Sequence, residues 1–257
     1  MRKNFGMQPW TFPQTVFIIG SYDENGKPDA MNAAWCGMGN DDEIVMCISA
    51  NHKTTKNILQ TKAFTVSFAT VDTLVASDFV GVVSGNDDPD KMEKSGLHEF
   101  KAENVNAPCF EEYPMTMECT LRAYDEDNCY MYGKIVNVSV DESVLTDGKP
   151  DPAKLQPIAF DQVNSKYLVV KDVVGNAFAD GFALQKLRTR TIQGDRYIVY
   201  LSPLLFISCF FLPVSSRDIH APRGPRKLCC DSVPRDGTAR GRRRNPGILP
   251  ACPAVLD

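Results

Sequence analysis

The sequence lacks the residue patterns that most often mark a metal site or a nucleophilic catalytic site. It contains three histidines, and neither His52 nor His98 has an acidic partner and a nucleophile at a recognisable spacing. It contains no HExxH and no CxxC motif. The nine cysteines, an odd number, show no paired spacing. We therefore predict no metal site, and the catalytic acid, base and nucleophile stay unknown.

The cysteines and the N-terminus indicate the compartment. Five cysteines fall in apolar or strand-like stretches of the first 185 residues: Cys36, Cys47, Cys109, Cys119 and Cys129. Such a scatter is typical of buried free thiols in a reducing environment. The residues that follow Met1 also lack the apolar segment of a signal peptide. We therefore expect a cytoplasmic protein.

Arginine is scarce in the first 185 residues and abundant after them. Residues 1–185 carry 15 Lys and Arg against 27 Asp and Glu, whereas residues 186–257 carry 13 against 5 Asp and contain no Glu. The net charge is therefore −12 in the first part and +8 in the second. Such a change is not expected within one folded unit. It predicts a boundary near Gln185, with a folded domain over 1–185 and an atypical tail over 186–257.

The tail combines an apolar run with an arginine-rich end. Residues 197–214 form an uncharged run of 18, near the lower limit for a membrane span, but Pro203 and Pro213 weaken any helix there. The Arg/Pro/Gly-rich remainder cannot bury a core, so we expect it to be disordered. Three interpretations stay open: a membrane anchor, an arginine-rich nucleic-acid tail, and an out-of-frame or read-through extension. The composition favours the third, so no nucleic-acid partner is expected, and no membrane contact is expected for the body.

Several short strands at hairpin spacing characterise the body. A buried strand over 17–22 ends at Asn25-Gly26, a strong hairpin signal, and a second strand follows over 30–35. Further strands are predicted over 43–50 and 64–69. The clearest hairpin pairs an alternating strand over 115–124 with one over 130–140. Short helices are predicted over 54–60, with Asn51 and Thr54 as candidate N-caps, and over 74–80.

This pattern predicts a mainly β fold, a β-barrel with short helices. A glycine-rich turn from a strand into a helix is missing, so a dinucleotide-binding Rossmann domain is not expected.

Residues 49–57 are the first candidate binding segment. They end a strand and open a helix, and they combine free backbone N–H groups, hydroxyl side chains and two lysines. A phosphate group needs such donors and the positive end of a helix. An ordinary capped helix with solvated lysines explains the same residues, so both interpretations stay open on the residues alone.

Two more segments are weaker candidates. Residues 78–85 contain Gly81 and Gly85, which would let the backbone approach a planar ligand, and Asp90-Lys91 follows. Residues 31–37 place small side chains beside Trp35. The first is equally a helix end that runs into a loop, and the second is equally core packing.

Taken together and in order, these segments resemble the flavin-reductase-like family and, within it, the flavoredoxins. The resemblance runs from about Trp10 to Gly181. The sequence DFVGVVSG at 78–85, with Asp90-Lys91, is the most distinctive match, and MNAAW at 31–35 adds to it. The resemblance implies a split barrel that binds FMN without a covalent link, as a homodimer with the flavin near the interface.

The resemblance also assigns residues to the cofactor. It implies that the isoalloxazine ring is lined by Asn32, Ala33, Ala34 and Trp35. It implies that the ribityl phosphate is surrounded by Ser49, Asn51, His52, Lys53, Thr54 and Thr55. It implies that the opposite side is closed by Ser84, Gly85 and Lys91.

Three functions are compatible with this resemblance. The first is an oxidoreductase that uses electrons from NAD(P)H to reduce flavin or a small acceptor. The second is an electron-transfer protein that exchanges electrons with a protein partner, which the acidic body would suit. The third is an FMN-binding module without turnover. In all three the cofactor carries the electrons, and the protein binds and orients it.

Overall fold

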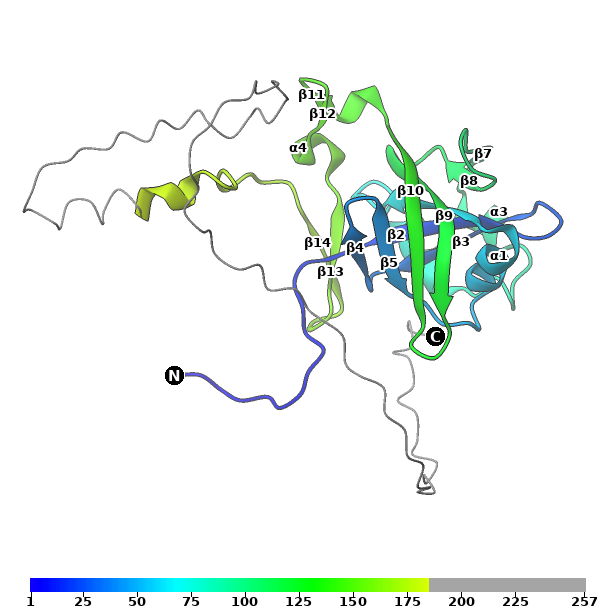
Figure 1. Cartoon of the computed structure of the whole chain (residues 1–257), viewed down its shortest axis with the longest axis horizontal. Helices are drawn as coiled ribbons and strands as arrows, with labels where there is room; N and C mark the ends of the chain where they lie inside the picture. Colours follow the sequence, from blue (N-terminus) through cyan, green and yellow to red (C-terminus); the bar gives the residue numbers. More distant parts are fainter. Residues whose placement is uncertain (185–257) are drawn as a thin grey trace, which may run out of the picture. The chain divides into compact units, whose positions relative to one another are not determined.

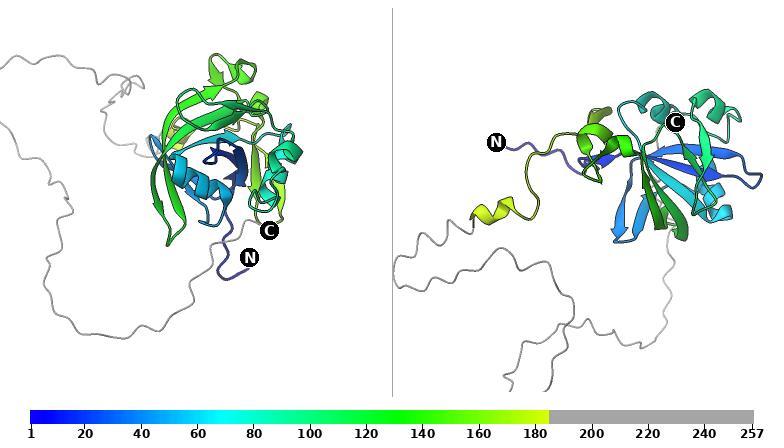
Figure 2. Two further views of the ribbon diagram at one scale, coloured as in Figure 1. Left: turned by 90° about the vertical axis from the view of Figure 1, so that its right-hand side faces the viewer. Right: turned by 90° about the horizontal axis from the view of Figure 1, so that it is seen from above.

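Antiparallel strands make up most of the regular structure in the computed structural model, which describes residues 1–184 (Figure 1). Seven of them form one curved sheet in the order β3-β2-β6-β9-β10-β5-β4. These strands are β2 (Phe17–Tyr22), β3 (Pro28–Ala33), β4 (Cys36–Asn40), β5 (Glu43–Cys47), β6 (Ala63–Phe68), β9 (Met115–Asp125) and β10 (Tyr130–Val140). The turned views in Figure 2 show this sheet curling into the half-barrel that defines the fold.

Smaller elements complete the described residues. A three-stranded sheet has the order β1-β13-β14, with β1 (Gln14–Thr15), β13 (Ile158–Asp161) and β14 (Lys166–Val169). Two short hairpins pair β7 (Glu99–Lys101) with β8 (Pro108–Phe110) and β11 (Leu145–Thr146) with β12 (Lys149–Pro150). The helices are α1 (Lys53–Thr61), α2 (Leu74–Val82), α3 (Lys91–Ser95), α4 (Pro152–Leu155) and the 3₁₀ turns η1 (Glu142–Val144) and η2 (Asp180–Phe182).

Strand β2 is buried along its whole length because each of its faces packs against a different core. Phe17 and Ile19 belong to the core inside the half-barrel, together with Phe64 and Met131. Ile18 points to the other face and joins a second core that contains Val80 of α2. Successive side chains of a strand alternate between faces, so a strand covered on both sides reads as a continuous apolar run. This explains the run that predicted the strand.

Two glycines allow the layers to approach closely. A Cβ on Gly20 of β2 would lie 2.5 Å from the Thr65 hydroxyl oxygen and 2.7 Å from the Pro108 carbonyl oxygen, so the β7–β8 hairpin can pack directly on the sheet. A Cβ on Gly133 of β10 would lie 2.2 Å from the Phe64 ring. The half-barrel interior is therefore filled at this point by an aromatic ring that needs a glycine opposite it.

Most predicted elements are confirmed. The strand over 17–22, the helix over 54–60 and the hairpin of 115–124 with 130–140 correspond to β2, α1 and β9–β10. The mainly β half-barrel with short helices agrees with the predicted fold class.

Two predictions are wrong. The strand expected to continue to Trp35 ends at Ala33, and a separate strand β4 begins at Cys36 because the chain turns to pair with β5. The N-cap of α1 is His52, and no side chain caps the helix. Thr54, one of the two expected caps, uses its hydroxyl elsewhere.

The described residues divide into two units. The first contains residues 1–174 and holds the two cores on either side of β2 and a third, smaller buried cluster. The described part of the second, residues 175–184, contains η2, whose Asp180 carboxylate accepts a hydrogen bond from the Asn176 backbone N–H at 2.8 Å. The predictions for 186–257, including the apolar run at 197–214, lie outside the described residues. Within residues 1–184, no helix has the length and apolarity needed to cross a membrane.

Substitution of Gly133 by Ala tests the packing of the half-barrel interior. The new methyl group overlaps the Phe64 ring, so we expect the free energy of unfolding to fall by about 1–3 kcal/mol. Urea denaturation monitored by circular dichroism measures it. Gly37→Ala, on the exposed edge strand β4 with open space around its Cβ, is the matched control. Equal stability of the two variants would contradict the packing argument.

Candidate functional site

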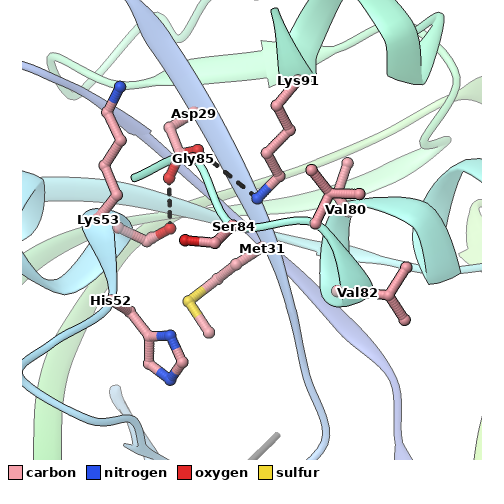
Figure 3. A pocket seen from close by; sticks show the side chains of 12 residues that line it. Asp29, Met31, His52, Lys53, Val80, Val82, Ser84, Gly85 and Lys91 are labelled. Atoms are coloured by element: carbon pink, nitrogen blue, oxygen red, sulfur yellow. Dashed lines mark hydrogen bonds and ion pairs between the residues drawn. The ribbon is translucent and has the colours of Figure 1, made fainter. Parts of the chain in front are cut away.

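A small pocket lies where β3, the start of α1 and the segment after α2 meet (Figure 3). Its volume is about 70 Å³. A cavity that holds one water molecule has a volume of roughly 10–15 Å³ on the same measure, so this pocket accommodates a group of a few heavy atoms. It is lined by Asp29, Met31, His52, Lys53, Thr54, Val80, Gly81, Val82, Val83, Ser84, Gly85 and Lys91.

The start of α1 presents backbone donors to this pocket. The first backbone N–H groups of an α-helix have no partner within the helix. Here the N-cap residue His52 provides no side-chain cap, and the first turn contains no acidic residue. The positive end of the helix dipole therefore lies at the pocket. The Lys53 side chain lines the same pocket, and its ammonium lies 3.9 Å from the Asp23 carboxylate. Such a helix start favours a bound anion.

Asp29 is a buried carboxylate at the base of the pocket, only 2 % exposed. The Thr54 hydroxyl donates a hydrogen bond to it at 2.5 Å, and the Lys91 ammonium lies 3.7 Å from its other oxygen. Lys91 is itself buried. Three separate segments, β3, α1 and α3, thus meet at one carboxylate.

Lys91 is incompletely compensated by this carboxylate. Burial lowers the pKa of its ammonium, and the attraction of Asp29 offsets this only in part, so the pKa remains below its ordinary value. The folded protein therefore holds the charged form of Lys91 less well than water does. An anion bound in the pocket would raise this pKa again. Lys91 and the start of α1 thus both favour an anion in the pocket.

Two glycines bring backbone against the charged groups. A Cβ on Gly85 would lie 2.6 Å from an Asp29 carboxylate oxygen and 3.0 Å from the Lys53 side chain. A Cβ on Gly81 would lie 2.8 Å from that of Asn32. The α2 helix and the segment after it can therefore approach β3 only because these positions lack side chains.

Comparison with family models assigns most of the described residues to one family. Residues 10–162 match the model described as the flavin reductase like domain. This chain belongs to the flavin reductase-like family of FMN-binding split-barrel domains. The match covers the half-barrel and every residue of the pocket.

Solved structures of two flavoredoxins are similar to this flavin reductase-like domain. The flavoredoxin of Desulfovibrio vulgaris (Miyazaki F) is 33% identical, covers 70% of this chain and 100% of its own, and has a TM-score of 0.67. The flavoredoxin of Methanosarcina acetivorans is 25% identical, covers 71% of this chain and 100% of its own, and has a TM-score of 0.64. An FMN-binding domain of a flavin reductases-like enzyme from Shewanella baltica shares the fold, at 18% identity over 63% of this chain and 89% of its own, with a TM-score of 0.57. The comparison with curated proteins finds no match.

Six of the thirteen residues that the sequence proposed for the cofactor line the pocket of the flavin reductase-like domain. They are His52, Lys53, Thr54, Ser84, Gly85 and Lys91. They come from the start of α1 and from the segment between α2 and α3, which are far apart in the sequence. The fold therefore brings together two segments that residue patterns alone proposed separately and that the family resemblance assigned to one cofactor.

The residues proposed for the ring lie outside the pocket. Asn32 is buried, and its side-chain amide donates to the Ser77 carbonyl oxygen of α2 at 3.0 Å. Ala33 lies in the half-barrel core. Ala34 and Trp35 are partly exposed, and the Trp35 ring packs at a tilt against Phe160, with the ring centroids 6.3 Å apart.

The remaining three proposed residues surround the start of α1 without lining the pocket. The Ser49 hydroxyl accepts a hydrogen bond from the Asn51 backbone N–H at 3.4 Å, and the Asn51 carbonyl oxygen accepts one from Asn86 at 3.1 Å. Thr55 is fully buried, and its hydroxyl has no partner among the described residues. These residues therefore support the start of α1 and the loop before it and do not line the pocket.

Sequence reasoning missed Asp29. It lies three residues after Gly26 of the Asn25-Gly26 turn, where an acidic residue is expected on the surface. The sequence carries no clear signal for its burial, because the predicted strand began at position 30 and β3 (PDAMNA) is itself partly polar.

The described residues hold no other cluster that suggests catalysis or metal binding. No group of three or more His, Cys, Asp and Glu that could hold a metal occurs among residues 1–184. The exposed His98 pairs with Glu112 at 2.6 Å, which raises the pKa of the imidazole, but no nucleophile is part of this contact.

Lys53→Met tests the anion site without any cofactor. Inorganic phosphate should stabilise the wild-type protein against heat, because it binds the folded state only. Loss of one charge-assisted contact should weaken the apparent phosphate affinity roughly 10- to 100-fold. Differential scanning fluorimetry across a phosphate titration, at constant ionic strength, measures this.

The control for this test is Lys62→Met, which removes the same charge from the exposed residue at the other end of α1. Equal stabilisation of all three proteins by phosphate would show that the ion does not bind at the start of α1.

Proposed function

We propose that this domain binds FMN without a covalent link and that the pocket holds the phosphate end of the cofactor. The observation that carries the proposal is the pairing of an uncapped helix start with two lysines, one of them buried and incompletely compensated. The family of the chain supports the same ligand. Lys53, Thr54 and the first N–H groups of α1 would bind the phosphate.

The donor set also fits the sugar-alcohol chain of FMN. A phosphate site made only of cations would suit any anion. This one contains the Asp29 carboxylate and the Ser84 hydroxyl, which can accept hydrogen bonds from ribityl hydroxyl groups. A polyol phosphate matches a pocket that offers both cations and acceptors.

The three-ring isoalloxazine is too large for a pocket of about 70 Å³ and would extend beyond it. Met31 and Val82 lie at the apolar end of the pocket (Figure 3), and we propose that the ring extends past them. Val82 is 55% exposed, and Met38 on the edge strand β4 is 61% exposed. We propose that a second copy of the chain covers such side chains, so that the working form is a homodimer with the flavin near the interface.

The proposed activity is that of an oxidoreductase that reduces flavin or a small acceptor with electrons from NAD(P)H. The bound flavin supplies the hydride or single-electron chemistry. The residues of this chain bind the phosphate, fix the ligand against β3 and exclude water from the charged end. No acid or base is assigned. We propose a cytoplasmic location, which is supported by the lack of a disulfide at any of the five cysteines of residues 1–184.

Electron transfer with a protein partner is the second candidate. Two observations favour it: similarity to two flavoredoxins, and an excess of 27 acidic over 15 basic residues in positions 1–185. A strongly acidic surface accelerates encounters with a basic partner. An FMN-binding module without turnover is the third.

Spectroscopy of the purified full chain distinguishes these functions. We expect a visible flavin spectrum, FMN as the flavin released on denaturation, and rapid bleaching of the bound flavin by NADH or NADPH. Bleaching by reduced ferredoxin alone would select electron transfer, and bleaching by neither would select the module. Absence of flavin after incubation with FMN would refute the cofactor proposal itself.

A further inference from the structure

The segment over 84–91 closes the phosphate end of the pocket. It leaves the end of α2, passes the charged groups and leads into α3. In Figure 3, Lys53, Asp29 and Lys91 gather around Gly85, whereas Met31 and Val82 lie toward the opposite end. A ligand held by its phosphate therefore has its anionic end against this segment and its apolar end away from it.

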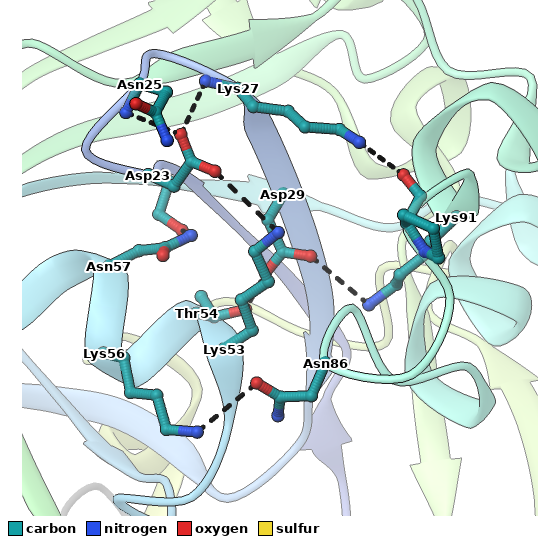
Figure 4. Close-up of polar contacts among 12 residues, drawn as sticks. Asp23, Asn25, Lys27, Asp29, Lys53, Thr54, Lys56, Asn57, Asn86 and Lys91 are labelled. Atoms are coloured by element: carbon teal, nitrogen blue, oxygen red, sulfur yellow. Dashed lines mark hydrogen bonds and ion pairs between the residues drawn. The ribbon is translucent and has the colours of Figure 1, made fainter.

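Three hydrogen bonds tie the segment to its surroundings, and Figure 4 draws two of them, those from Lys56 and from Lys27. The Asn86 side-chain N–H donates to the Asn51 carbonyl oxygen at 3.1 Å, and the Lys56 ammonium donates to the Asn86 side-chain oxygen at 3.3 Å. The Lys27 ammonium donates to the Pro89 carbonyl oxygen at 2.5 Å. The segment is thus fixed both to the start of α1 and to the β2–β3 hairpin.

Little space is left between this segment and the charged groups. The positions of a hypothetical Gly85 Cβ, 2.6 Å from Asp29 and 3.0 Å from Lys53, show that the backbone lies in direct contact with both. A second phosphate and a nucleoside attached to the bound phosphate would meet this segment on that side of the pocket. The hydrogen bonds of Asn86 hold it closed.

From this arrangement we infer that the site selects flavins with a terminal phosphate and rejects dinucleotide flavins, and that Asn86 sets this specificity. The inference rests on the proposed function, because it presumes that the pocket holds the phosphate of a flavin. Charge cannot distinguish FMN from FAD. A phosphate monoester near pH 7 carries about −1.5 to −2, close to the two charges of a pyrophosphate. The space available beyond the first phosphate distinguishes the two flavins.

Binding of FMN and of FAD to the full chain tests the inference. We expect the wild-type protein to bind FMN at least tenfold more tightly than FAD, measured by quenching of flavin fluorescence. Asn86→Ala removes both side-chain hydrogen bonds that close the segment, so FAD affinity should rise about tenfold while FMN affinity changes little. Lys56→Met removes only one of these bonds and should give a smaller change in the same direction.

Asp87→Ala is the matched control, since Asp87 is the exposed neighbour on the same segment. It should leave the ratio of FMN to FAD affinity at the wild-type value. Circular dichroism of each variant establishes that the fold is retained.

The failure of this inference differs from the failure of the proposed function. Wild-type protein that binds FMN and FAD equally would overturn the inference and leave FMN binding intact. A wild-type preference that Asn86→Ala does not reduce would also overturn it, because another feature would then exclude FAD. Wild-type protein that binds neither flavin would refute the proposed function on which the inference rests.

Discussion

The contact of Asp29 with Thr54 and Lys91 is the constraint on which the candidate site depends. A carboxylate that is 2 % exposed is unstable without a cation and a hydrogen-bond donor, so the fold must deliver both. It does so from segments 25 and 62 residues further along the chain. Once α1 and α3 meet at this carboxylate, the segment between α2 and α3 has little freedom in how it passes the start of α1.

The start of α1 stays open to a ligand. Its N-cap residue, His52, makes no side-chain cap hydrogen bond, and Thr54, the second residue of the helix, donates its hydroxyl to Asp29. A buried ion pair of this kind is weak evidence for added stability, since desolvation offsets much of the attraction. The effect of the Asp29–Lys91 pair here is on position: it holds the Lys91 ammonium in the same small pocket that the start of α1 lines.

The two-sided burial of β2 positions this arrangement within the fold. Ile19 and Ile18 point into different cores, so β2 fixes the half-barrel on one side and the α2 layer on the other. Strand β3 pairs with β2 along six residues, and this register fixes where Asp29 lies along the strand relative to α1. Glycines at 81 and 85 then allow the α2 layer to approach β3. The site is therefore a product of sheet register and of close packing, more than of any single loop.

The sequence by itself determined the class of fold, most strands, and the two segments that carry the lysines. Those features are local: alternation, turn residues and helix starts act over a few positions and can be read in order. The tertiary structure alone decided that Asp29 is buried, that Asn32 bonds to α2 and does not line the pocket, and that β4 follows Trp35 as a separate strand. These outcomes depend on which face of a strand meets a helix and on partners 25 or more residues away, and no local pattern encodes them.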